Sequence, residues 1–260
     1  MQRALARLYT DEVYRGSAFG DGSDATRSSL GTEEAGWLET LDRTRVERYA
    51  RSLRRKRMRL VRDWVPLIGR SMGEVFATVF NAYARENPSV PTRPLDDAMG
   101  FLDFLRQSGL QEPTYLPDLV RCEYLRLRVM RAEDKPSPGL VLLSDQSVLR
   151  LTPRATVELF SFDVAWIRAR LANGESVDAI QARCWILVGR PLGASDARVT
   201  RIEEASARLL ALCDGTRTLG EMLGVLAAEA GLAGSLRPRL AWEATDFLHP
   251  LVAHGLLTAG

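Results

Sequence analysis

Residues 197–257 read ARVTRIEEASARLLALCDGTRTLGEMLGVLAAEAGLAGSLRPRLAWEATDFLHPLVAHGLL. The spacing of apolar residues in this stretch predicts a strand, a helix, a polar turn, a second helix and a last helix, in that order. Their expected ranges are 198–202, 204–213, 214–218, 219–230 and 240–254. This order of elements is typical of a small winged-helix domain.

The turn at 214–218 carries clear local signals. Gly215 can take the left-handed conformation that ends one helix, and Thr218 can cap the next helix with Glu221 in a capping box. Large apolar residues around this turn recur at helical spacing and should form one small core. They are Leu209, Leu210, Leu219, Met222, Leu223, Leu226, Phe247, Leu248, Leu251, Leu256 and Leu257.

The last predicted helix has the wrong charge for reading DNA. It holds Glu243 and Asp246 and has no Lys or Arg after Arg239. A helix that enters a DNA groove presents basic and amide side chains to phosphates and base edges. The acidic helix therefore indicates a ligand other than DNA.

The run from Leu209 to Leu223, followed by a helix that ends in His254-Gly-Leu-Leu257, resembles the PqqD-like recognition element of enzymes that modify ribosomally made peptides. In that family a winged-helix-like domain holds a leader peptide as an added strand on its sheet edge. The resemblance implies peptide-binding residues on the edge strand and on the last helix beside it. They are Val199, Thr200, Arg201, Ile202, Trp242, Phe247 and Leu251, of which the last three are alternatively core residues.

The most basic segment lies earlier in the chain. Between Arg43 and Arg62 there are nine Arg and one Lys against one acid, Glu47, while apolar residues keep one helical stripe. The segment is therefore an amphipathic helix with a cationic back. That back is either a solvated face or a docking surface for an acidic partner or peptide.

Further helical patterns follow and predict a bundle of four main helices up to about residue 132. After the basic helix, their apolar stripes run over 68–83, 95–108 and 115–130. Glu123 falls on the inward side of the fourth helix. It is either a buried carboxylate paired with an Arg or a catalytic acid.

The order Phe80-x-x-Tyr83-x-x-x-Asn87-Pro88, Asp97-Ala98-x-x-Phe101 and Leu116-Pro117-Asp118-Leu119-x-Arg121-x-Glu123 is similar to the N-terminal domain of partner proteins of multinuclear non-haem iron oxidases. These partners include the accessory subunits of methanobactin (MbnC-like) and 3-thiaglutamate (TglI-like) biosynthesis. With the PqqD-like region, the resemblance covers residues 42–257.

This resemblance implies a non-catalytic subunit that forms a heterodimer with a TIM-barrel oxidase, binds a precursor peptide and presents its cysteine. Iron is expected in the oxidase, with no cofactor or metal in this chain. The expected partner-interface residues are Arg51, Arg54, Arg55, Arg121 and Glu123. In the 3-thiaglutamate type, the closer match, the β-carbon of a C-terminal cysteine is excised. In the methanobactin type, Cys becomes oxazolone and thioamide.

The predicted fold is mostly α with an α+β C-terminal part. Residues 1–41 form an N-terminal segment with a linker at 15–36, residues 42–134 the helical bundle, and residues 135–260 the winged-helix-like domain. In the last of these, residues 134–139 read as a linker, and strands are predicted at 140–143, 157–162 and 184–188. A helix capped by Asp163 is predicted at 164–172, and 189–196 connects a hairpin.

The residue inventory argues against catalysis by this chain alone. Its two histidines, His249 and His254, lie about 140° apart around a helix, so they share no metal-binding face. The three scattered cysteines are typical of reduced thiols in a cytoplasm. No signal peptide or run of ~20 apolar residues is evident.

Two other functions stay open. The basic helix would also suit a nucleic-acid-binding protein, whose affinity would fall steeply with salt. A stand-alone interaction module without an enzyme partner is the third possibility.

Overall fold

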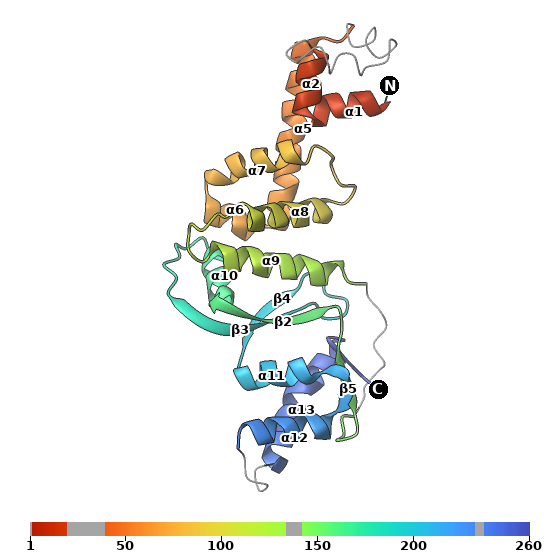
Figure 1. The fold of residues 1–260 in the computed structure, drawn as a ribbon, viewed down its shortest axis with the longest axis vertical. Coiled ribbons are helices and arrows are strands. Elements are labelled where there is room, and N and C mark those ends of the chain that lie inside the picture. Colours follow the sequence, from red (N-terminus) through yellow and green to blue (C-terminus); the bar gives the residue numbers. More distant parts are fainter. Residues whose placement is uncertain (1, 20–39, 134–141, 232–236) are drawn as a thin grey trace. The chain divides into compact units, whose positions relative to one another are not determined.

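The computed structural model describes residues 2–19, 40–133, 142–231 and 237–260. The chain divides into two compact units, residues 1–109 (unit 1) and residues 110–260 (unit 2). The described residues are mainly helical and include two three-stranded antiparallel sheets (Figure 1). This confirms the predicted fold class. No helix among the described residues is long and apolar enough to cross a bilayer.

Unit 1 is built around one long helix, α5 (Arg43–Trp64), against which α1, α7 and α8 pack (Figure 1). Its other helices among the described residues are α1 (Gln2–Thr10), α2 (Glu12–Ala18), α6 (Pro66–Met72), α7 (Val75–Glu86) and α8 (Pro94–Gln107). Asp42 caps α5 by accepting a hydrogen bond from the Arg45 amide. The apolar stripe of α5 buries Val46, Ala50 and Val61, as the sequence pattern predicts.

Aromatic rings fill the centre of unit 1. The ring centroids of Phe76 and Phe101 lie 5.2 Å apart, and those of Phe80 and Tyr83 lie 5.8 Å apart, both in edge-to-face geometry. Residues 68–83, predicted as one helix, form two, because Gly73 adopts a φ of 55° and ends α6.

Arg57 is a basic residue of α5 that faces the core instead of solvent. Its guanidinium donates to both carboxylate oxygens of Asp97 on α8, at 2.8 and 2.7 Å, and to the Asn87 carbonyl at 2.8 Å. Tyr83 donates its hydroxyl to the same carboxylate at 2.7 Å. Burial, reinforced by Asp97, raises the pKa of Tyr83. These bonds fix α5, α7 and α8 to one another.

Unit 2 contains five helices and six strands among its described residues. The helices are α9 (Leu116–Arg131), α10 (Val164–Ala172), α11 (Glu204–Leu212), α12 (Leu219–Glu229) and α13 (Arg237–Ala253). One sheet has the order β2 (Ala155–Phe162), β3 (Gln181–Gly189), β4 (Arg198–Ile202). The other has the order β5 (Asp214–Thr218), β1 (Val148–Leu151), β6 (Leu257–Ala259).

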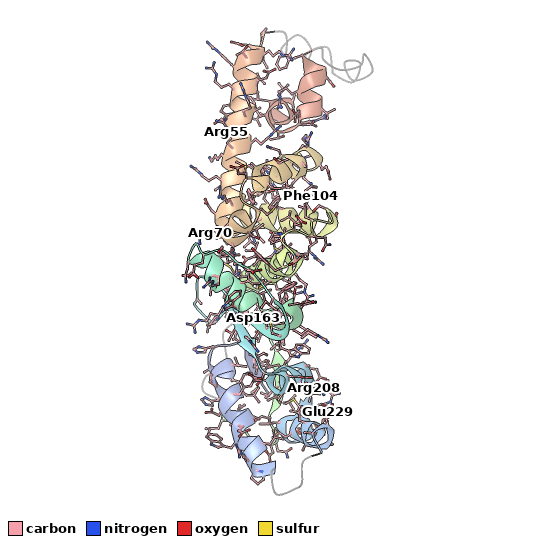
Figure 2. All side chains as sticks on the ribbon, turned by 90° about the vertical axis from the view of Figure 1, so that its left-hand side faces the viewer. Arg55, Arg70, Phe104, Asp163, Arg208 and Glu229 are labelled. Atoms are coloured by element: carbon pink, nitrogen blue, oxygen red, sulfur yellow. The ribbon has the colours of Figure 1, made fainter. Side chains whose placement is uncertain are left out.

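The β2–β3–β4 sheet is covered on both faces. Ile186 and Val188 of β3 pack with residues of α9 and α10 in one core. Leu187, which points to the opposite face, packs with residues of α11, α12 and α13 in the second core. Arg208 of α11 pairs with Glu229 of α12 at 2.9 Å, so an ion pair links these helices (Figure 2).

Most predicted elements of unit 2 are present. The capping box of Thr218 and Glu221 forms, Gly215 has a φ of 83°, and Asp163 caps α10. However, residues 214–218, predicted as a turn, form strand β5 paired with β1. Strands β1 and β6 were not predicted.

Some predicted boundaries differ from the structure. Helix α9, expected to complete the N-terminal bundle, packs on β2 and β3 and belongs to unit 2, so the division falls at 109/110 and not near 134. Residues 15–18, expected in a linker, belong to α2. Leu142 and Leu143, expected in a strand, are not in one. The rest of that strand, the linker at 134–139 and the linker residues 20–36 lie outside the described residues.

Candidate functional site

Strand β4 lies at one edge of the β2–β3–β4 sheet. Its residues pair only with β3 among the described residues, in the register Val188↔Val199, Leu187↔Thr200, Ile186↔Arg201 and Trp185↔Ile202. An edge strand presents unpaired backbone N–H and C=O groups along its outer side. Such a strand can accept an extended peptide as an additional strand.

An open cavity of about 390 Å³ lies beside this strand. Leu159 of β2, Trp185 of β3 and Ile202 of β4 line it, and the strand register aligns these three residues across the sheet. The remaining lining residues are Arg183, Cys184, Arg201, Glu203 and Glu204. The cavity thus offers an apolar floor with charges of both signs around it.

The predicted edge-strand residues take different roles. Ile202 lines the cavity, whereas Val199 packs against the core shared with α9 and α10. Arg201 pairs with Asp163 at the start of α10, with their side-chain atoms 3.1 Å apart. Thr200 is exposed.

The last helix does not complete this site. Helix α13 packs against α11, α12 and β6, and none of its described side chains lines the cavity. Phe247 and Leu251 are half-buried against the core, which matches their alternative interpretation as core residues. Trp242 is 68% exposed. The expectation that α13 lies beside the edge strand is therefore corrected: the first residue of α11, Glu204, borders the cavity instead.

Sequence reasoning missed Trp185 as a site residue. The apolar run at 184–188 indicated a strand, but not which of its side chains face the cavity. That depends on the pairing of Trp185 with both Leu159 and Ile202. A register shift of one residue would have turned Trp185 to the opposite face.

The expected partner-interface residues fall into two groups. Arg51 and Arg55 are exposed on α5, and Arg54 pairs with Glu12 at 3.2 Å (Figure 2 labels Arg55). Arg121 is held within unit 2, because it pairs with Glu158 at 2.9 Å and lies over the Phe160 ring at 4.3 Å.

Glu123 is 1% exposed and forms ion pairs with Arg126 and Arg168. Arg126 also pairs at 2.8 Å with Asp196, whose side chain is exposed. The structure thus matches the interpretation of Glu123 as a buried, paired carboxylate. Its assignment to a partner interface is corrected, since so little of it reaches the surface.

The three cysteines are buried and form no disulfide. Burial raises the pKa of Cys122 to about 11 and that of Cys213 to about 12. Both are therefore protonated at neutral pH and are poor nucleophiles. Within the described ranges, no group of three or more His, Cys, Asp or Glu side chains could hold a metal ion.

Comparison with known proteins places one part of the chain. Residues 39–107 match the family model described as SCO6045-like, C-terminal domain. In the structure, this range includes α5 to α8 of unit 1. No match to the chain was found among curated proteins.

Proposed function

We propose that this chain is a non-catalytic partner subunit that captures the leader of a precursor peptide and presents its cysteine to a TIM-barrel multinuclear iron oxidase. The observation that carries this proposal is the open β4 edge beside the cavity of Leu159, Trp185 and Ile202. The resemblance of residues 42–257 to partners of such oxidases supplies the class of enzyme and peptide.

Capture would use the main chain first. A leader segment pairs with the outer edge of β4, so backbone hydrogen bonds supply affinity without demanding a particular sequence. Side chains alternate between the two faces of a strand, and those on the cavity face meet Trp185 and Ile202. The cavity therefore selects the leader.

The chemistry belongs to the oxidase and its iron. This chain contributes positioning: a tethered peptide keeps its cysteine near the iron site at high effective concentration. We propose excision of the β-carbon of a C-terminal cysteine, as in 3-thiaglutamate biosynthesis. The alternative within the same class is conversion of Cys to oxazolone and thioamide, as in methanobactin biosynthesis.

Co-expression with a candidate TIM-barrel oxidase and its precursor peptide tests this function. We expect a stoichiometric complex that carries iron, measured by light scattering and metal analysis, and this chain purified alone should be iron-free. Thr200→Pro in this chain should lower peptide retention if the Thr200 amide is an outward donor. A chain that stays monomeric with every such oxidase would contradict the proposal.

The exposed basic residues of α5 favour a second candidate, nucleic-acid binding. Arg48, Arg51, Arg55 and Arg59 are exposed on this helix, but Arg57 is buried and Arg43 and Arg54 pair with carboxylates. Duplex binding would lose about 0.9 log units of affinity per neutralised phosphate per log unit of salt. Nucleic acid that salt strips from the purified chain would favour this function.

A further inference from the structure

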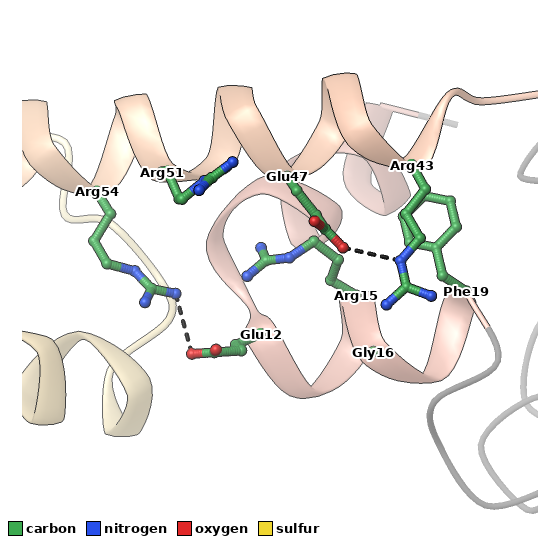
Figure 3. A pocket seen from close by; sticks show the side chains of 8 residues that line it. All are labelled: Glu12, Arg15, Gly16, Phe19, Arg43, Glu47, Arg51 and Arg54. Carbon is green, nitrogen blue, oxygen red and sulfur yellow. Dashed lines mark hydrogen bonds and ion pairs between the residues drawn. The ribbon is translucent and has the colours of Figure 1, made fainter.

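A separate charged groove lies within unit 1, between α2 and the first half of α5. It has a volume of about 350 Å³. Its lining residues are Glu12, Arg15, Gly16, Phe19, Arg43, Glu47, Arg51 and Arg54 (Figure 3). Four arginines against two glutamates leave the lining with an excess of positive charge.

The two glutamates of the groove are already engaged. Glu12 accepts from Arg54 at 3.2 Å, and Glu47 accepts from Arg43 at 2.9 Å. Arg15 and Arg51 extend into the space between these two ion pairs (Figure 3). Among the described residues, neither of them forms an ion pair. Two guanidinium groups thus share a groove in which no carboxylate is bonded to them.

Arg15 is in an unfavourable position for a cation. It is half-buried and donates to the Leu8 carbonyl at 2.9 Å, which is a neutral acceptor. Burial, followed by repulsion from Arg54, lowers its pKa below the ordinary value. An anion placed between Arg15 and Arg51 would offset both effects.

We propose that the α2–α5 groove binds a carboxylate side chain of an acidic peptide segment. Guanidinium groups match the two oxygens of a carboxylate in bidentate geometry. Phe19 offers an apolar wall for the methylene stem of a bound Asp or Glu. Glu12 and Glu47 at the two ends disfavour a ligand with dense negative charge, such as a nucleic-acid backbone. This site belongs to unit 1 and is independent of the proposed capture at β4.

The test uses the full chain and a short fluorescein-labelled peptide of alternating Gly and Glu, followed by fluorescence anisotropy. Arg15→Gln and Arg51→Gln should each weaken binding about tenfold, the effect of losing one charge-assisted hydrogen-bonded pair. Arg51→Gln removes no hydrogen bond or ion pair among the described residues, so its effect is separate from folding. Arg59→Gln is the matched control, because Arg59 is exposed on the same helix outside the groove, and it should leave binding nearly unchanged.

Glu12→Gln should have the opposite effect. It releases Arg54 and removes a competing negative charge, so the Glu peptide should bind more tightly. A second labelled peptide, in which every Glu is replaced by Gln, serves as the uncharged control. The proposal is overturned if the Glu peptide does not bind, if the Gln peptide binds equally well, or if Arg59→Gln weakens binding as much as Arg51→Gln. Preferential binding of a short DNA duplex, weakened alike by all the arginine variants, would also overturn it and indicate a nucleic-acid surface.

Discussion

Units 1 and 2 offer a ligand different chemistry. The α2–α5 groove of unit 1 presents guanidinium groups, and its selectivity would come from charge. The β4 edge of unit 2 presents backbone groups beside Trp185, and its selectivity would come from apolar contact. Within unit 1, the arginines of α5 also differ in burial. Arg57 is buried in the core and paired with Asp97, while Arg51 is exposed. The position of an arginine around one helix therefore separates a structural role from a binding role.

The largest expected effect tests the structural role of Arg57. Asp97→Ala leaves this guanidinium buried without its carboxylate, so the free energy of unfolding should fall by about 3–5 kcal/mol. Urea denaturation measures this change. Asp103→Ala on the same helix is the control, because Asp103 forms an exposed pair with Arg106, worth about 0–1 kcal/mol. Equal losses of unfolding free energy in the two variants would contradict the distinction between the buried, structural Arg57 and the exposed arginines.

The next effect separates the β4 cavity from α13. Trp185→Ala should weaken binding of the precursor peptide by at least about tenfold, since a buried tryptophan contact contributes ~2 kcal/mol in many interfaces. Trp242→Ala, on the exposed face of α13, should leave the affinity unchanged. Fluorescence anisotropy with labelled peptide measures both. A larger loss of affinity in Trp242→Ala than in Trp185→Ala would indicate that the peptide binds at α13 and not at the β4 cavity.

Salt should distinguish the two sites. Raising the ionic strength from about 0.1 to about 1 M shortens the Debye length from ~10 to ~3 Å. Binding of the Gly-Glu peptide at the groove should weaken markedly, while peptide binding at β4 should change little. Titrations at both ionic strengths check this. Equal salt dependence at the two sites would show that charge governs both.

The last effect concerns pH. Burial raises the pKa of Cys213 in the folded state above its ordinary value of 9.0. Because the folded state binds this proton more tightly than the unfolded state, Cys213 contributes its full stabilisation below pH 9.0. The free energy of unfolding then falls as the pH rises toward the pKa of the folded state, by at most about 1.4 kcal/mol per pH unit. Denaturation between about pH 9 and 11 should show this decline, and Cys213→Ala should show less of it. If stability declines with pH equally in Cys213→Ala and in the unchanged chain, Cys213 does not contribute to the decline.

Sequence reasoning predicted what depends on neighbouring residues. The Thr218–Glu221 capping box, the Asp163 cap and the left-handed Gly215 all involve groups within three residues of one another. It missed what depends on distant pairing. Strand β1 is four residues long and pairs with β5 and β6, which lie far along the chain. No local signal identifies such a strand.

The candidate sites show the same limit. The edge strand at 198–202 was predicted, but the cavity beside it requires residues from three strands and the start of α11. The basic face of α5 was also predicted. That Arg57 faces inward follows only from the place of Asp97 on α8, and the groove exists only because α2 lies against α5.

The most direct test of peptide capture is hydrogen–deuterium exchange of the full chain with and without the precursor peptide. Added strand pairing predicts slower exchange of amides in 198–202, with little change in α13. Slower exchange confined to α13 or α5, with 198–202 unchanged, would contradict capture at the β4 edge.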